Sequence, residues 1–160
     1  MKVAATLRVN GIDCPVEIEP HASLLTTVRE EIGLTGSKEG CDDSECGACM
    51  MMLDGEPVNS CSYLALQAEG REITTVEGLA PGSELSGLQR AFLDYGGVQC
   101  GFCTPGMLIS AAALLRRTPR PSEEEVRIAL AGNLCRCTGY DGIVKAVLAT
   151  AETSASPGSP

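Results

Sequence analysis

Eight of the nine cysteines in this chain of 160 residues fall into two groups of four, and the spacing within each group is typical of an iron–sulfur site. The first group is Cys41, Cys46, Cys49 and Cys61, and the second is Cys100, Cys103, Cys135 and Cys137. A loop that supplies three thiolates, followed by a fourth from a later strand, is the pattern of a plant-type [2Fe–2S] site. The sequence therefore predicts two clusters in one chain, an arrangement suited to moving single electrons.

Zinc and disulfide bonds are the two alternative uses of these cysteines. Zinc ribbons usually combine two Cys-x2-Cys knuckles, whereas each group here contains only one such pair. The chain begins with MKVAATLRVN, which lacks the apolar stretch and cleavage site of a secretory signal, so we expect a cytoplasmic protein. Cytosolic thiols stay reduced, which favours metal ligands over disulfides. Cys14 belongs to neither group and is interpreted as a small buried apolar side chain.

The first half of the chain has the elements of a β-grasp ferredoxin domain, which we place at residues 1–78. Alternating apolar and polar residues, with turn residues at Asn10-Gly11 and Asp54-Gly55, predict two hairpins. Ser23 is the expected N-cap of a helix whose apolar residues share one face. The expected strands cover residues 3–9, 14–19, 48–53, 57–61 and 72–76, and the expected helix covers residues 23–32.

Helical signals dominate the second half, and residues 79–152 are expected to form a four-helix [2Fe–2S] domain. Ser86 and Ser122 each begin a capping box, Thr104-Pro105 offers an N-cap followed by a favoured first residue, and Asp141 can cap a last helix. Each cysteine pair of the second group lies just before a helix, so two helix N-termini should face one anionic cluster. The fold class expected is α+β, with a disordered tail at residues 153–160.

Charge is distributed unevenly along the chain. Residues 1–80 carry 14 acidic and 5 basic side chains, whereas residues 81–160 carry 7 of each. An acidic half argues against nucleic-acid binding, which needs a basic surface, and no apolar run approaches the ~20 residues that span a membrane. Carboxylates in and beside the first cysteine loop should lower the potential of an anionic cluster there, unless solvent screens them: Glu39, Asp42, Asp43 and Glu45.

The segments GCDDSECGAC, QCGFCTPGM and LAGNLCRCTGY together resemble the small iron–sulfur subunit of the molybdenum hydroxylases, the xanthine oxidase/dehydrogenase family. Members with separate subunits include carbon monoxide dehydrogenase, 4-hydroxybenzoyl-CoA reductase and the quinoline, isoquinoline and nicotine oxidoreductases. The resemblance covers about residues 3–150. The three methionines at residues 50–52 depart from the usual pattern after the third ligand, where relatives commonly have Thr-Val and an aliphatic residue.

The resemblance implies a role for each cysteine group and for one glutamine. Cys41, Cys46, Cys49 and Cys61 would ligate the distal cluster, toward FAD, and Cys100, Cys103, Cys135 and Cys137 the proximal cluster, beside the pterin. Gln99 matches a glutamine that hydrogen-bonds the pterin. The resemblance also implies a large subunit with molybdopterin, as the cytosine dinucleotide in most bacteria, and a medium subunit with FAD, assembled as a dimer of heterotrimers.

Two functions follow as hypotheses. In the first, the chain is the electron-relay subunit of a molybdenum hydroxylase, which makes it part of an oxidoreductase while the substrate-converting site lies on another chain. In the second, it is a free two-cluster ferredoxin. No catalytic residue is expected in this chain, and His21, its only histidine, is interpreted as a surface residue.

Overall fold

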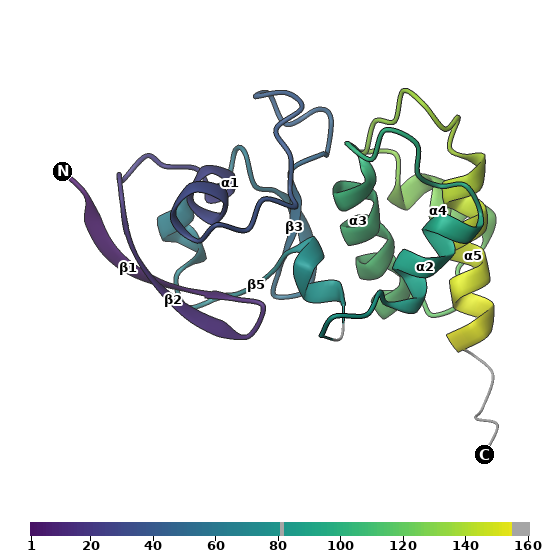
Figure 1. Ribbon diagram of the computed structural model, residues 1–160. Helices are drawn as coiled ribbons and strands as arrows, with labels where there is room; N and C mark the ends of the chain where they lie inside the picture. Colours follow the sequence, from purple (N-terminus) through teal and green to yellow (C-terminus); the bar gives the residue numbers. More distant parts are fainter. Residues whose placement is uncertain (81, 155–160) are drawn as a thin grey trace, which may run out of the picture.

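The computed structural model describes residues 1–80 and 82–154, and it has the expected α+β class. Figure 1 shows a sheet-containing part, from the N-terminus to about residue 80, beside a helical part that contains the rest of the described chain. The strands are β1 (Val3–Val9), β2 (Ile12–Ile18), β3 (Met50–Leu53), β4 (Glu56–Asn59) and β5 (Glu72–Thr74). The α-helices are α1 (Leu24–Thr26), α2 (Gly87–Asp94), α3 (Thr104–Arg117), α4 (Glu123–Ala129) and α5 (Asp141–Ser154).

The five strands form one mixed sheet in the order β2-β1-β5-β3-β4. The β1–β2 and β3–β4 pairs are antiparallel hairpins, and the central contact between β1 and β5 is parallel. Both hairpin turns place two consecutive residues at positive φ, as a type I′ turn requires: Asn10 and Gly11 (52° and 79°), and Asp54 and Gly55 (51° and 91°). The turn residues identified in the sequence therefore set the register of both hairpins.

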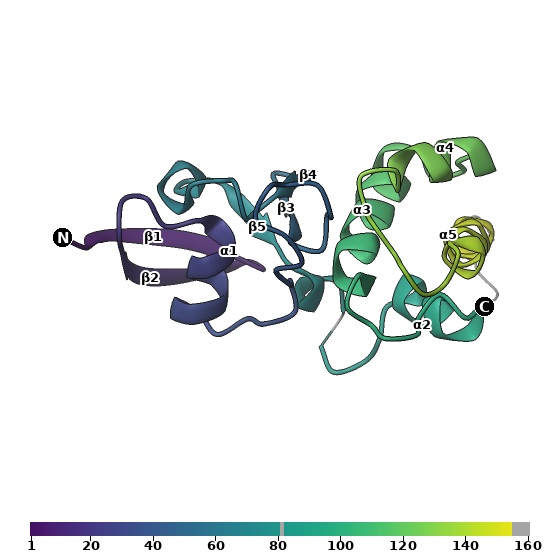
Figure 2. The ribbon, with the colours of Figure 1, turned by 90° about the horizontal axis from the view of Figure 1, so that it is seen from above.

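A short helix covers one face of this sheet (Figure 2). Ser23 accepts a hydrogen bond from the Thr26 amide at 3.0 Å, which makes it the N-cap as expected. After α1 the helix continues as a π-helical segment, η1 (Thr27–Glu31), so the helix predicted over residues 23–32 is present with a wider second turn. The helix contributes three buried side chains to a core shared with Leu7 and Ile73 of the sheet: Leu24, Leu25 and Val28.

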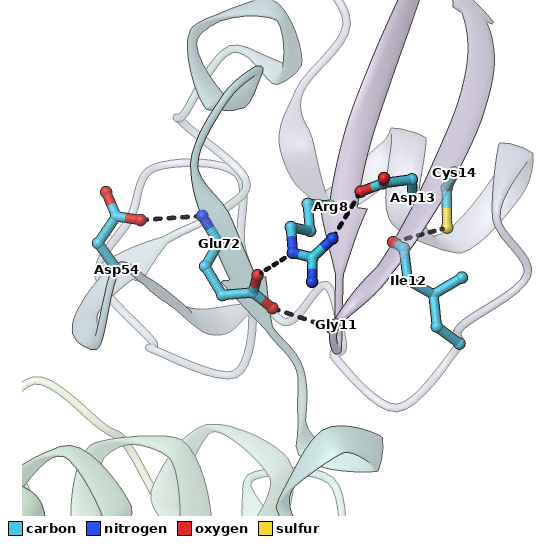
Figure 3. Close-up of polar contacts among 7 residues, drawn as sticks. All are labelled: Arg8, Gly11, Ile12, Asp13, Cys14, Asp54 and Glu72. Atoms are coloured by element: carbon cyan, nitrogen blue, oxygen red, sulfur yellow. Dashed lines mark hydrogen bonds and ion pairs between the residues drawn. The ribbon is translucent and has the colours of Figure 1, made fainter.

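Polar contacts of Glu72 connect β5, the central strand of the sheet, to both hairpins (Figure 3). Glu72 accepts from Arg8 at 2.8 Å and from the Gly11 amide at 2.9 Å, while its own amide donates to Asp54 at 2.8 Å. Arg8 also pairs with Asp13 at 3.0 Å. These side chains are largely exposed, so each ion pair contributes at most about 1 kcal/mol. Their main effect is to orient β5 beside the two turns.

The helical part is organised by two capping boxes. Ser86 and Ser122 each accept from the amide three residues on, while Gln89 and Glu125 reach back to the cap amides. Helices α2, α3, α4 and α5 enclose a second core, in which Phe92, Met107 and Ile143 are almost fully buried.

Three details of these helices differ from the sequence expectation. Asp141, expected as the cap of the last helix, is instead the first residue of α5. Helix α3 begins one residue earlier than expected, with Cys103 rather than Thr104 as the N-cap, and Thr104 Oγ1 is buried with no hydrogen-bond partner among the described residues. Helix α5 continues to Ser154, two residues into the expected tail, and residues 155–160 lie outside the described part.

The two parts meet where β3 packs against α3. Met52, Ile109 and Ala113 form a small buried cluster at this junction, while Met51 and Leu53 point into the first core. The methionine run therefore contributes to the first core on one side and to the junction cluster on the other, because alternate residues of a strand face opposite sides. Among the helices of residues 1–80 and 82–154, none combines the length and hydropathy needed to cross a bilayer.

Candidate iron–sulfur centres

The first cysteine group lies in a loop between η1 and β3, with its last member after β4. The four thiols influence one another's ionisation: Cys41 contributes to raising the pKa of Cys46, and Cys61 contributes to raising that of Cys49. Cys46 also influences the ionisation of Cys49, so the two pairs are neighbours. Cys61, which is 12 residues beyond Cys49 in the sequence, reaches the loop because the β3–β4 hairpin reverses the chain.

The backbone of this loop is shaped to approach sulfur. Ser44 and Gly47 have positive φ values of 65° and 70°, and the Cys46 amide points at Cys41 Sγ at 3.4 Å. A Cβ added to Gly40 would lie 3.0 Å from Cys46 Sγ, so the glycine leaves room for the thiol. Amides turned toward sulfur stabilise a thiolate, because each supplies the positive end of a dipole.

The second group comes from two loops, each of which precedes a helix. Cys103 is the N-cap of α3, and Cys137 lies four residues before Asp141, where α5 begins. Thiols of the two loops influence each other across the gap in sequence, since Cys135 contributes to raising the pKa of Cys103 and Cys100 to raising that of Cys137. The N-terminus of α3 therefore lies at Cys103, and its partial positive charge favours an anionic centre there, whereas the role of the α5 N-terminus stays a prediction.

Burial and hydrogen bonding set the acidity of these thiols in opposite directions. Burial raises the pKa of Cys49 to about 11 and that of Cys103 to about 12. Burial also opposes ionisation of Cys135, but the Thr138 hydroxyl at 3.0 Å and amide at 3.5 Å outweigh it and lower the pKa of Cys135. A bound metal ion supplies the positive charge that keeps buried thiolates ionised.

This arrangement fits a binuclear cluster with four cysteines. The thiols meet two by two, and two glycines at positive φ, Gly47 and Gly101, shape the backbone beside them. Within the described residues, no three His, Cys, Asp or Glu side chains gather closely enough to hold one metal ion. Two adjoining pairs are what two iron atoms with two terminal thiolates each would need.

The two cysteine groups are in direct contact through their loops. The Leu134 amide donates to the Cys46 carbonyl at 2.9 Å, so a residue next to Cys135 is hydrogen-bonded to a member of the first group. Phe102, between Cys100 and Cys103, lies over the first loop, and a Cβ added to Gly40 would be 3.2 Å from its ring. This proximity could not be predicted from the spacing of the cysteines.

The remaining candidate residues lie at the surface or away from the thiols. Gln99 is exposed beside Cys100, and Cys100 and Cys137 are exposed as well. His21 is exposed, as expected. Cys14 is half-buried on β2, where its thiol faces the Ile12 carbonyl at 3.6 Å (Figure 3), so the expectation of full burial was too strong.

Replacing Cys14 with serine should leave all iron in place and cost less than about 1 kcal/mol of stability, because a half-exposed hydroxyl keeps access to water. Iron analysis and thermal unfolding of the variant beside the wild type check this. Loss of iron from the variant would show that Cys14 belongs to a ligand set.

Comparison with known proteins supports an iron–sulfur function for both halves. Residues 7–80 match the family described as "2Fe-2S iron-sulfur cluster binding domain", and residues 75–148 match the family described as "[2Fe-2S] binding domain". The nicotinate dehydrogenase small FeS subunit of Eubacterium barkeri is 47% identical over 97% of this chain and 99% of its own length. The xanthine dehydrogenase iron-sulfur-binding subunit of Escherichia coli O157:H7 is 48% identical over 88% and 89% of the two chains.

A solved structure shows the same fold. A chain of quinoline 2-oxidoreductase from Pseudomonas putida 86 superposes with a TM-score of 0.92 at 45% identity, covering 96% of each chain. Fold and thiol arrangement together define a two-part iron–sulfur protein of the [2Fe–2S] class. More closely, the chain belongs to the small iron–sulfur subunits of the molybdenum hydroxylase, or xanthine dehydrogenase, family, and is thus the iron–sulfur part of an oxidoreductase.

Proposed function

We propose that this chain relays electrons between molybdopterin on a large subunit and FAD on a medium subunit of a molybdenum hydroxylase. Residues 1–78 would be its β-grasp ferredoxin domain and residues 79–152 its four-helix [2Fe–2S] domain. The observation that carries the proposal is the contact between the loops of the two cysteine groups, where the Leu134 amide donates to the Cys46 carbonyl at 2.9 Å. A [2Fe–2S] cluster, when bound, accepts and releases one electron at a time.

The pairing of the thiols suggests which of them share an iron atom. Within the distal site, Cys41 and Cys46 would hold one iron, and Cys49 and Cys61 the other. Within the proximal site the assignment crosses the two loops, so that Cys103 and Cys135 hold one iron, and Cys100 and Cys137 the other. Each proximal iron would then be held by both loops, which ties the start of α3 to the loop before α5.

Exposure around the proximal thiols favours a subunit over a free carrier. Cys100 and Cys137 are exposed, and the large apolar side chains beside them are too, with Phe102 at 47% and Leu134 at 58%. Large apolar groups exposed together indicate a surface that a partner covers. Gln99, exposed at the same place, can donate and accept hydrogen bonds toward a pterin. We infer a cytoplasmic dimer of heterotrimers, in which the large subunit covers this surface.

The test is to purify the untagged protein from its native cells and analyse its metals. We expect about four irons and four acid-labile sulfides per chain, two EPR signals on reduction, and co-elution with molybdenum and flavin polypeptides. A chain that elutes alone near 16.6 kDa with both clusters would instead be a free two-cluster ferredoxin. Half of this iron, or stoichiometric zinc, would contradict the two-cluster assignment.

The carboxylates beside the distal thiols should make that cluster harder to reduce. Glu39, Asp42, Asp43 and Glu45 are all exposed. Changing Asp42 and Asp43 together to asparagine should raise the distal potential modestly, because water and salt screen exposed charges. Redox titration followed by EPR measures this shift. The potential of the proximal cluster serves as the internal reference, and we expect it to be the higher of the two because the N-terminus of α3 lies near that cluster.

A further inference from the structure

Asn133 is a buried polar residue at the contact between the two cysteine groups. Its side chain is 1% exposed, and it directly precedes Leu134, whose amide donates to the Cys46 carbonyl. Asn133 Nδ2 donates to the Gly47 carbonyl at 3.1 Å, and its Oδ1 accepts from the Ser110 hydroxyl at 2.7 Å. One side chain therefore connects the distal loop, helix α3 and the loop that leads to Cys135.

We propose that Asn133 is a positioning residue that fixes the separation and orientation of the two clusters. The proposal rests on the function proposed above, because it presumes that both clusters are bound. Asn133 contacts no thiol in any hydrogen bond described here, so its effect would pass through the backbone of Gly47 on one side and of Cys135 on the other. Its amide is suited to this role, since it donates to one loop while it accepts from the helix behind it.

The packing around Asn133 leaves the loops no room to shift toward each other. A Cβ at Gly106 would overlap the Gly47 carbonyl oxygen, and a Cβ at Gly47 would overlap the Gly132 carbonyl oxygen. The backbones are thus already in contact. Movement apart would leave the buried amide of Asn133 without its partner, which is costly in a low-dielectric interior. The backbone contact prevents the two loops from moving closer, and the hydrogen bond of Asn133 opposes their moving apart. The distance between the loops is therefore restrained in both directions.

Ser110 orients Asn133 from the helix. It is 3% exposed on α3, and its hydroxyl lies 2.8 Å from Met50 Sδ as well as within reach of Asn133. Sulfur is a weak acceptor, so the hydroxyl proton is directed to the amide oxygen of Asn133. This fixes which end of the amide faces Gly47. Loss of the Ser110 hydroxyl should make the Asn133 side chain more mobile, while the Asn133 Nδ2 group can still donate to the Gly47 carbonyl.

The experiment uses the intact holoenzyme with three variants of this chain. Asn133→Asp keeps the shape and the acceptor for Ser110 but replaces the donor to Gly47 with an oxygen that repels the carbonyl. Ser110→Ala removes the orienting bond only. Ser122→Ala is the control, because it removes the cap of α4 and lowers stability away from the junction. For each we measure iron content, thermal stability and the splitting that spin–spin interaction adds to the EPR signals of the fully reduced enzyme.

With iron content at the wild-type level, we expect Asn133→Asp to reduce or broaden this splitting, Ser110→Ala to do so less, and Ser122→Ala to leave it unchanged despite lower thermal stability. Wild-type splitting in a fully loaded Asn133→Asp enzyme would overturn the proposal. If that variant does not assemble, Ser110→Ala decides: altered splitting supports the proposal and wild-type splitting overturns it. Failure of the proposed function is distinct, since the wild-type enzyme itself would then lack one cluster.

Discussion

Replacing Cys103 with alanine is expected to remove the proximal cluster and stop electron flow to the flavin, while the distal cluster stays loaded. Cys103 is proposed to share an iron atom with Cys135, so its loss would leave that iron with a single thiolate. Loss of residues that only support a metal ligand typically costs 10–100-fold in metal affinity or activity. Loss of a ligand itself should therefore lower turnover by more than about 100-fold.

Iron analysis, EPR and steady-state turnover of the purified complex check this expectation. The Cys103→Ala enzyme should hold half of the wild-type iron and show only the distal EPR signal. Cys14→Ala is the matched control, because it removes a half-buried thiol that belongs to neither group. If Cys103→Ala kept both signals, the proximal ligand set proposed here would be wrong.

Local sequence signals predicted the parts of the fold that depend on a few neighbouring residues. Asn10-Gly11 and Asp54-Gly55 have the positive φ values of tight hairpin turns, and Ser86 and Ser122 form the capping boxes that their spacing indicated. These motifs are readable because each partner lies within three residues. Thr104 shows the limit of such rules, since the preceding Cys103 occupies the N-cap position instead.

Contacts between distant segments could not be read in the same way. Spacing divided the cysteines into two sets of four, but it could not show which members of the second set influence each other, such as Cys100 and Cys137. Asn133 gave no signal either, because a lone asparagine before a cysteine is usually a loop residue. Its importance becomes visible only when Gly47, 86 positions earlier, is found within hydrogen-bonding distance. The sequence pattern thus predicted candidate ligands, whereas the contact between the two loops required the tertiary structure.

Replacing Gly47 with alanine is expected to destabilise the protein by roughly 2–5 kcal/mol. About 1–2 kcal/mol would come from placing a side chain at a φ of 70°, and about 1–3 kcal/mol from overpacking against Gly132 and Asn133. The chain provides a matched control in Gly33, which has a φ of 83° but nothing within 4 Å of an added Cβ. Gly33→Ala should therefore lose only the stability that alanine loses at a positive φ.

Thermal unfolding of the iron-loaded variants separates the two contributions. At this chain length, 1 kcal/mol corresponds to about 2–4 °C in Tm, so Gly47→Ala should unfold several degrees below Gly33→Ala. The overlap could be relieved only if the loop at Gly132 moved away from the distal loop, because the atoms facing Gly47 are mostly backbone. Equal losses in both variants would mean that the two loops separate at no cost, and that their contact contributes little to holding the halves of the chain together.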